Sequence, residues 1–287
     1  MMTEQSMMMG LGLGMAMILQ VATAAEAVKP AAGGFGAPED ITFKALFDGS
    51  PQKYVQLTPA TGVSPTKPVD VLLAFHGHGS DRWQYINDGR GECKGARDFA
   101  AAHGMIYISP DYRAATSWMG PAAEADVKQI IGLLRKKHKV GRVFLTGASM
   151  GGTSVLIFAA LHPDLVDGVT SLNGMANMEE YKGFLPAIAA SYGGDKKTKP
   201  EEYKKRSAEL FPEKFTMPVA FAVGGKDGIV PPDSVRRLAA KLKDMKRDVL
   251  MIDNLNGGHA TSHADTTAAL EFMLKTATAK PKKKTAF

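Results

Sequence analysis

The chain has 287 residues, of which 45% are hydrophobic, so it can bury a large core, and we expect one folded domain. Its net charge is +6, but Lys280, Lys282, Lys283 and Lys284 in the last eight residues supply four of these charges. The rest of the chain is close to neutral, which argues against a nucleic-acid partner. Cys93 is the only cysteine, which excludes an internal disulfide.

The first 27 residues have most features of a secretory signal. An apolar run over residues 7–24 leads into two small-x-small cleavage patterns, Ala-Thr-Ala and Ala-Glu-Ala. The usual basic start is missing, because residues 1–6 include Glu4 and no Lys or Arg. A retained membrane anchor stays open as the alternative, although the run is short for a span. We therefore expect a signal peptide over residues 1–27, a secreted or periplasmic protein, and no stable membrane insertion after cleavage.

Composition divides the rest of the chain into three parts. Residues 28–40 are rich in Ala, Gly and Pro, which indicates a linker, and residues 279–287 form a basic tail that we expect to be disordered. Between them, residues 41–278 alternate short β-branched runs with longer helical patterns. This alternation is typical of βαβ units and predicts an α/β domain with a mostly parallel twisted sheet flanked by helices.

The predicted elements follow from this alternation. Buried strands are expected at 69–75, 105–109, 142–146, 166–172, 218–223 and 248–252, and antiparallel edge strands at 41–47 and 54–57. Helices are expected at 121–137, 150–161, 232–242 and 263–276. The stretch 174–215 is longer than a simple crossover needs. We interpret it as a small helical insertion over the carboxyl edge of the sheet.

A Gly-x-Ser-x-Gly turn joins the strand at 142–146 to the helix at 150–161. In such a turn the serine takes a strained backbone conformation, and the two glycines avoid clashes with the neighbouring strand and helix. The serine hydroxyl is thereby presented at the amino end of a helix. Ser149 is therefore the predicted nucleophile.

A serine hydroxyl near its ordinary pKa is a poor nucleophile, so Ser149 needs a base, and the base needs an orienting acid. In this strand–turn–helix arrangement both follow the serine, the acid first. Asp227 lies in Gly-Gly-Lys-Asp-Gly directly after a predicted strand and is the predicted acid. His259 lies in Asn-Gly-Gly-His after the last predicted strand and is the predicted base.

Three other residues compete for these roles. Asp233 fits the first turn of the next helix, where its charge complements the helix dipole. Asp253 lies at the end of a strand. His263 falls where the final helix begins, so we expect it to cap that helix or to be exposed.

A tetrahedral oxyanion requires two N–H donors. One is expected to be the backbone N–H of Met150, directly after the nucleophile, and the other should come from the loop Phe-His-Gly-His-Gly-Ser at 75–80. His78 is the predicted second donor, with Gly79 as the next choice. His76 and His78 are only two residues apart, but without a further ligand cluster they do not indicate a metal site. We expect neither a metal nor another cofactor.

Together these residues resemble a known family, the esterase and prolyl-oligopeptidase-like branch of the α/β-hydrolases, which includes bacterial feruloyl- and acetylxylan-esterase-like proteins. The resemblance covers about residues 69–274. It is carried by the loop His-Gly-His-Gly at 76–79, by Gly-Ala-Ser-Met-Gly-Gly at 147–152, by Gly-Gly-Lys-Asp-Gly-Ile-Val-Pro at 224–231 and by Gly-Gly-His at 257–259. It implies the α/β-hydrolase fold and a serine hydrolase.

The residues and the resemblance predict a carboxylic-ester hydrolase that works through an acyl-enzyme on a small-molecule or polymer-linked ester. A small serine peptidase of the prolyl-oligopeptidase-like group is the alternative, and a binding protein that has lost catalysis is a further one. Aromatic side chains near the pocket loops could stack on the substrate. Those expected to contact it are Trp83, Tyr112 and Trp118.

Overall fold

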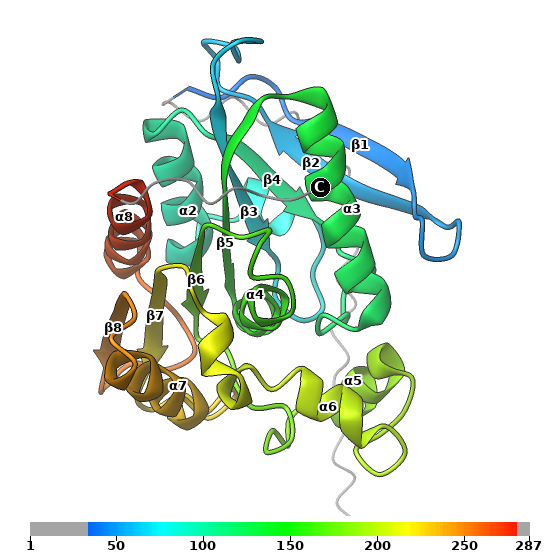
Figure 1. Cartoon of the computed structure of the whole chain (residues 1–287), viewed down its shortest axis with the longest axis vertical. Helices are drawn as coiled ribbons and strands as arrows, with labels where there is room; N and C mark the ends of the chain where they lie inside the picture. Colours follow the sequence, from blue (N-terminus) through cyan, green and yellow to red (C-terminus); the bar gives the residue numbers. More distant parts are fainter. Residues whose placement is uncertain (1–33, 280–287) are drawn as a thin grey trace, which may run out of the picture.

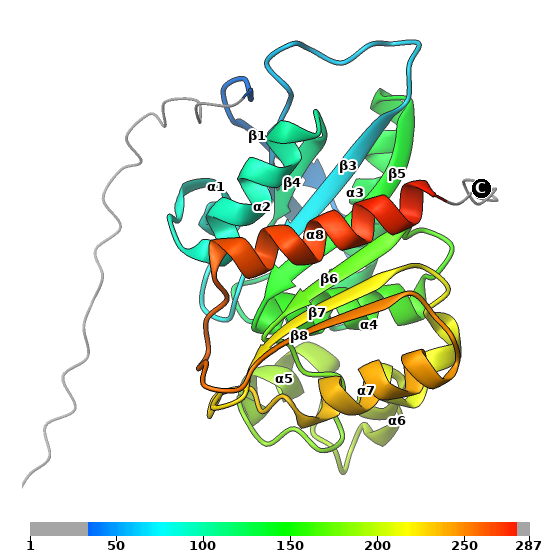
Figure 2. The same cartoon turned by 90° about the vertical axis from the view of Figure 1, so that its left-hand side faces the viewer.

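The computed structural model describes residues 34–279, which form one sheet with helices on both faces (Figure 1, Figure 2). The eight strands are β1 (Glu39–Lys44), β2 (Pro51–Leu57), β3 (Val69–Phe75), β4 (Ile106–Pro110), β5 (Val140–Ala148), β6 (Gly168–Leu172), β7 (Val219–Gly224) and β8 (Val249–Asn254). They lie in the order β1-β2-β4-β3-β5-β6-β7-β8. The pairs β1–β2 and β2–β4 are antiparallel, and the other neighbours are parallel.

The helices are α1 (Gln84–Asn87), α2 (Gly91–Ala102), α3 (Pro121–Lys137), α4 (Met150–Leu161), α5 (Leu185–Tyr192), α6 (Pro200–Lys205), α7 (Asp233–Asp244) and α8 (His263–Thr278). Two short 3₁₀ helices, η1 (Ala208–Leu210) and η2 (Pro212–Lys214), precede β7. Helices α2 and α8 pack together on one face of the sheet, as Figure 2 shows, whereas α3, α4 and α7 cover the other face.

The central strands are apolar on both sides because both faces of the sheet are covered. In β3, Val71, Leu73 and Phe75 point into the core beneath α3 and α4. Leu72 and Ala74, which alternate with them, point into the core beneath α2 and α8. All five side chains are fully buried. A strand of a parallel sheet therefore appears in the sequence as a continuous apolar run.

Most expected elements are present, with ends that differ by a few residues. The strand at 69–75 and the helices at 121–137 and 150–161 have the expected bounds. The edge strand expected at 41–47 is instead β1, and Leu46 and Phe47 after it are exposed in the turn that leads to β2. Helix α2 was not expected, because glycine and charged residues dominate its first turns.

The fold begins earlier than the expected linker boundary at residue 40. Phe35 is buried, pairs with Pro59 in a β-bridge and packs its ring 6.1 Å from that of Tyr107. The described part of the expected linker therefore belongs to the folded body. The expected signal peptide at 1–27 and all of the expected tail at 279–287 except its first residue lie outside the described residues. Among residues 34–279, no helix has the length and apolar character needed to cross a membrane.

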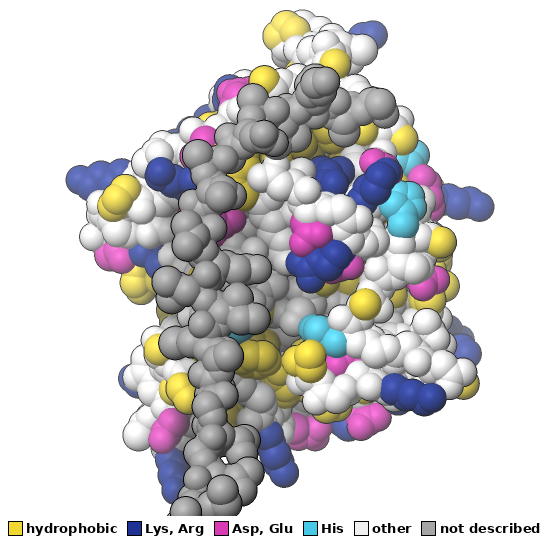
Figure 3. Space-filling view, turned by 180° about the vertical axis from the view of Figure 1, so that it is seen from behind, with side chains coloured by type: hydrophobic (Ala, Val, Ile, Leu, Met, Phe, Trp, Pro, Cys, Tyr) yellow, Lys and Arg dark blue, Asp and Glu magenta, His cyan; other side chains and the backbone are white. Residues whose placement is uncertain are grey.

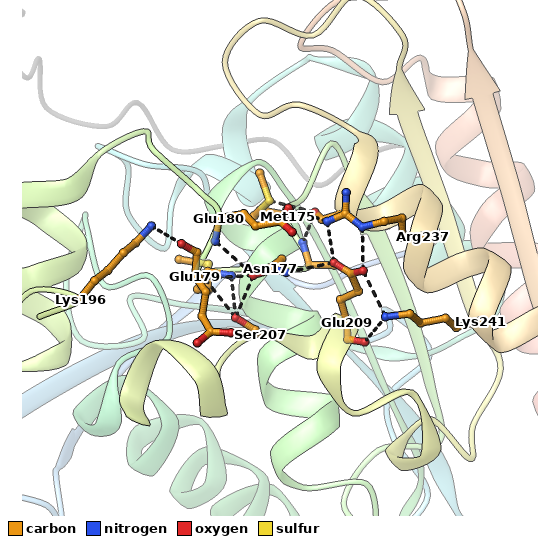
Figure 4. A network of polar contacts seen from close by, with 12 residues as sticks. Met175, Asn177, Glu179, Glu180, Lys196, Ser207, Glu209, Arg237 and Lys241 are labelled. Carbon is orange, nitrogen blue, oxygen red and sulfur yellow. Dashed lines mark hydrogen bonds and ion pairs between the residues drawn. The ribbon is translucent and has the colours of Figure 1, made fainter. Parts of the chain in front are cut away.

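The stretch expected as an insertion, 174–215, holds α5, α6 and both 3₁₀ helices, and α5 and α6 lie beyond the end of the sheet at the bottom of Figure 1. A buried carboxylate fixes its last part to α7 (Figure 4). Glu209 accepts hydrogen bonds from Arg237 at 2.7 and 2.8 Å, from Lys241 at 3.2 Å and from Asn177 at 3.1 Å. The hydrogen bonds from Arg237 are the main cause that lowers the pKa of Glu209 to about 2.

Candidate active site

Ser149 occupies the sharp turn between β5 and α4. Its backbone has φ 59° and ψ −121°, a conformation that costs a non-glycine residue about 1–3 kcal/mol. A Cβ on Gly147 would overlap the backbone of Gly151, and a Cβ on Gly151 would overlap the carbonyl oxygen of Phe75. Glycine at both positions therefore lets β3, β5 and α4 approach closely enough to hold the serine at the carboxyl edge of the sheet.

Asp227 and His259 meet at the same edge, on the loops after β7 and β8. The His259 Nδ1 atom lies 2.6 Å from Asp227 Oδ2. The other oxygen, Oδ1, accepts the backbone N–H groups of Ile229 and Val230, both at 2.9 Å. The Asp227 side chain is buried, while that of His259 is 21% exposed. A carboxylate oxygen at this distance favours the tautomer with its proton on Nδ1, which leaves Nε2 as the ring nitrogen able to accept a proton.

Asn173, which the sequence reasoning did not select, joins the acid to the histidine loop. Its Nδ2 donates to Asp227 Oδ2 and to the carbonyl oxygen of Gly258, both at 3.3 Å. Its Oδ1 accepts the Thr261 hydroxyl at 2.5 Å. Asn173 follows β6 with a positive φ of 47°, which asparagine tolerates better than most residues. The Asn-Gly pair directly after a predicted strand was the available signal.

Backbone contacts hold the acid loop and the histidine loop together. A Cβ on Gly224 would overlap the carbonyl oxygen of Gly258. Only glycine at position 224 therefore lets the backbones of the two loops approach this closely. The N–H of Lys226 donates to the carbonyl oxygen of Gly257 at 2.8 Å. The glycine pairs of both motifs therefore serve the alignment of Asp227 with His259.

Ser149 and His259 line one cavity of about 40 Å³, together with Gln84, Arg90 and Cys93. One water molecule needs about 10–15 Å³ of cavity volume on the same measure, so the cavity has room for a group of a few heavy atoms. The thiol of Cys93 is buried, and burial is the main cause that raises its pKa to about 12. At neutral pH this thiol is protonated and is a poor nucleophile.

The rival residues are engaged elsewhere. Asp253 forms two hydrogen bonds with Arg236, at 2.8 and 2.9 Å, and Asp233 lies at the first position of α7. His263 begins α8 and pairs through Nε2 with Asp98 on α2 at 2.8 Å. Figure 3, which views the molecule from behind Figure 1, shows histidine side chains at the surface close to acidic ones. None of these three rivals is among the residues that line the cavity.

The loop after β3 has one free amide among the described residues 77–79. Gly77 donates its N–H to Gln84 Oε1 at 2.7 Å, and Gly79 donates to the carbonyl oxygen of Ala115 at 2.7 Å. The N–H of His78 makes no hydrogen bond within the part of the chain that the structure describes. Met150, at the first position of α4, has an N–H that a helix leaves without an internal partner. Because the Gly79 N–H is already bonded and the His78 N–H is not, these hydrogen bonds favour His78 over Gly79 as the second donor.

Two of the three aromatic residues expected to contact substrate lie in the core instead. Trp118 is fully buried, and its indole N–H donates to His78 Nδ1 at 3.0 Å. Tyr112 is also buried, with its hydroxyl donating to the carbonyl oxygen of His76 at 2.6 Å. Trp83 is half-buried and packs against Arg82. None of the three lines the cavity beside Ser149. Trp118 and Tyr112 instead donate hydrogen bonds to the loop after β3.

His76 is likewise part of the interior. Its Nδ1 lies 2.8 Å from the carbonyl oxygen of Gly77 and its Nε2 3.2 Å from that of Asp111. Burial lowers the pKa of its ring. Within residues 34–279, no three side chains of His, Cys, Asp or Glu gather in a way that could hold a metal ion.

Solved structures share this fold at low sequence identity. A candidate dipeptidyl aminopeptidase IV from Bacteroides ovatus aligns with a TM-score of 0.66 and 16% identity, over 86% of this chain and 36% of its own length. The fluorophosphonate-binding serine hydrolase FphF of Staphylococcus aureus aligns at 0.63 and 18%, over 86% and 98%. An S-formylglutathione hydrolase from Agrobacterium tumefaciens aligns at 0.64 and 15%, over 86% and 96%.

The chain thus spans about a third of the first of these proteins and nearly the full length of the other two. No curated protein matches the sequence. The family comparison is more specific, since residues 96–278, more than half of the chain, match the prolyl oligopeptidase family. The expected fold is therefore confirmed. The chain belongs to the prolyl oligopeptidase family and is a serine hydrolase with the α/β-hydrolase fold.

Proposed function

We propose that this serine hydrolase cleaves carboxylic esters through an acyl-enzyme, with Ser149, His259 and Asp227 as a catalytic triad. The observation that carries the proposal is the 2.6 Å contact between Asp227 and His259 beside a cavity that His259 shares with Ser149. A buried carboxylate in this position holds the imidazole in one tautomer and stabilises the imidazolium that forms during attack.

In the first step, His259 Nε2 takes the proton from the Ser149 hydroxyl as the oxygen attacks the ester carbonyl carbon. The N–H groups of Met150 and His78 stabilise the negative oxygen of the tetrahedral intermediate. The intermediate collapses when the bond to the alcohol oxygen breaks and His259 returns its proton to that oxygen. Water, deprotonated by His259, then attacks the acyl-enzyme, and the acid leaves as Ser149 regains its proton.

The size of the cavity beside Ser149 favours a short-chain ester as the substrate. A cavity of about 40 Å³ accepts a short acyl group more readily than a peptide side chain. The similar solved structures include both a hydrolase named for S-formylglutathione and a candidate dipeptidyl aminopeptidase, so the shared fold is compatible with either activity. The family name favours a peptidase as the second candidate.

Hydrolysis of matched aryl esters and aminoacyl aryl amides separates the two candidates. We expect turnover of short aryl esters in an acyl series from acetyl to octanoyl plus feruloyl, with weak or no amide cleavage. The Ser149→Ala variant should lose about four to six orders of magnitude in kcat. Cleavage of amides alone would make the protein a peptidase, and activity retained by the variant would show that Ser149 is not the nucleophile.

A further inference from the structure

One buried residue contacts both residues that supply the proposed oxyanion N–H groups. The indole N–H of Trp118 donates to His78 Nδ1 at 3.0 Å. The backbone N–H of the same residue donates to Met150 Sδ at 3.4 Å. His78 follows β3 and Met150 begins α4, so Trp118 joins two segments that are far apart in the sequence. The neighbouring loop adds a third link, from the Gly79 N–H to the carbonyl oxygen of Ala115 at 2.7 Å.

The backbone around Trp118 is strained, and hydrogen bonds from the 174–215 segment hold it in place. Trp118 and Met119 have positive φ values of 43° and 53°, which cost free energy in residues with side chains. The hydroxyl of Tyr192 on α5 donates to the carbonyl oxygen of Trp118 at 3.0 Å. Arg206, fully buried after α6, donates to the carbonyl oxygen of Met119 at 2.7 Å. The 174–215 segment therefore maintains the conformation that directs Trp118 toward the oxyanion loop.

A ring from the same segment completes the contact. Phe184, just before α5, places its ring centroid 4.2 Å from that of His78 and 5.4 Å from that of Trp118. The His78 imidazole is thus fixed by a hydrogen bond at its edge and by an aromatic ring at its face.

We infer that Trp118 is a positioning residue for the oxyanion hole, which fixes the His78 amide relative to that of Met150 and connects both to the 174–215 segment. The inference rests on the proposed function, because it assigns Trp118 a part in the same acyl transfer. Since an indole N–H can only donate, His78 Nδ1 must accept, and the neutral ring carries its proton on Nε2. Trp118 acts through His78 and does not contact substrate.

The variant Trp118→Phe tests this directly, because it removes the N–H and keeps an aromatic ring. Removal of one oxyanion donor typically costs about 100- to 1,000-fold in kcat. In Trp118→Phe the His78 donor is still present but less well fixed, so the loss of activity should be smaller. We expect kcat to fall about tenfold while KM stays within about twofold. The assay uses whichever aryl ester or amide the parent cleaves, and thermal melting shows that the variant is folded.

Phe184→Leu provides a second test that does not alter the buried indole. It removes the ring over His78, and we expect kcat to fall about threefold with KM unchanged. Phe99→Leu is the matched control, because Phe99 forms a similar pair with His103, with ring centroids 4.6 Å apart, on α2. The control should keep the kcat and KM of the parent.

Nitrogen-15 NMR gives a readout that is independent of activity. Nδ1 of His78 should be unprotonated in the parent near neutral pH, and this single tautomer should be lost in Trp118→Phe. A protonated Nδ1 in the parent would overturn the inference, as would an unchanged kcat in folded Trp118→Phe or, if that variant does not fold, in Phe184→Leu. A rise in KM alone would make Trp118 a substrate contact. Failure of the proposed function appears separately, as a parent without esterase activity or an active Ser149→Ala variant.

Discussion

The two halves of the site are built in different ways. The acid–base half joins Asn173, Asp227 and His259, which follow the neighbouring strands β6, β7 and β8, respectively, at one edge of the sheet. The oxyanion half depends on Trp118, which reaches His78 across 40 positions of sequence and is held by residues of the 174–215 segment. The first half is a product of the parallel sheet itself, whereas the second requires a correctly packed loop and insertion.

This difference determines which changes abolish chemistry and which only reduce it. Loss of a group in the acid–base half removes a proton acceptor or its orientation. Loss of a contact in the oxyanion half displaces an amide that is still present. A third region is the Glu209 network between the insertion and α7. Glu209 makes no hydrogen bond to the five residues named for the two halves, so its loss should affect stability alone.

The largest effect should follow from Asp227→Asn. An amide in this position donates where the carboxylate accepts, so His259 would be held in the wrong tautomer, and we expect kcat to fall about 10⁴-fold. Steady-state kinetics on the preferred ester gives the measurement. A loss below about tenfold would mean that Asp227 does not orient the base, and Asp233 or Asp253 would have to be reconsidered.

A smaller effect should follow from Asn173→Ala. The change removes hydrogen bonds to Asp227 and to the Gly258 carbonyl oxygen, so the carboxylate and the histidine loop should lose alignment. We expect kcat to fall about ten- to hundredfold with little change in KM.

Asn177→Ala is the matched control for Asn173→Ala. Asn177 is also buried, but it donates to Glu209 and lies in the third region. The control should lose stability and keep the kcat of the parent. Equal loss of kcat in both variants would show that a buried asparagine near the sheet edge matters only through stability, and the distinction between the regions would fail.

The smallest effect on catalysis should follow from Glu209→Gln, which is expected to leave kcat unchanged. Its stability effect depends on pH, because the hydrogen bonds of Arg237 hold the pKa of Glu209 at about 2, below the ordinary glutamate value. A lowered pKa stabilises the fold above the ordinary value of about 4, and this contribution is lost as the pH falls toward 2.

Urea unfolding at pH 7 and pH 3 measures this contribution. The parent should lose more stability between these two pH values than Glu209→Gln, and at pH 7 the variant should be less stable by about 1–3 kcal/mol. Equal acid sensitivity of parent and variant would show that Glu209 is not the group that responds.

The parallel strands, and the loops that carry the three proposed triad residues, could be predicted from the sequence because each depends on a short segment. Apolar runs mark buried strands, and glycine-rich motifs after three of them mark Ser149, Asp227 and His259. Asn173 was less visible, since an Asn-Gly pair after a strand is equally compatible with a simple turn.

Trp118 shows what the sequence leaves undetermined. An aromatic residue near a pocket loop has the same local pattern whether it faces substrate or core, and only long-range packing decides between them. Its contacts with His78, Met150 and Phe184 come from three separate segments. The early start of the fold at Phe35 has the same cause, because its partners Pro59 and Tyr107 are distant in sequence.

The central claim is that acyl transfer occurs on the oxygen of Ser149, and trapping the intermediate tests it most directly. The protein is mixed with a short-chain aryl ester, quenched with acid within milliseconds to seconds, digested and analysed by mass spectrometry. We expect one acyl group on the peptide that contains Ser149, and none in Ser149→Ala. Turnover without an acyl adduct on Ser149, or an adduct on Cys93 instead, would contradict it.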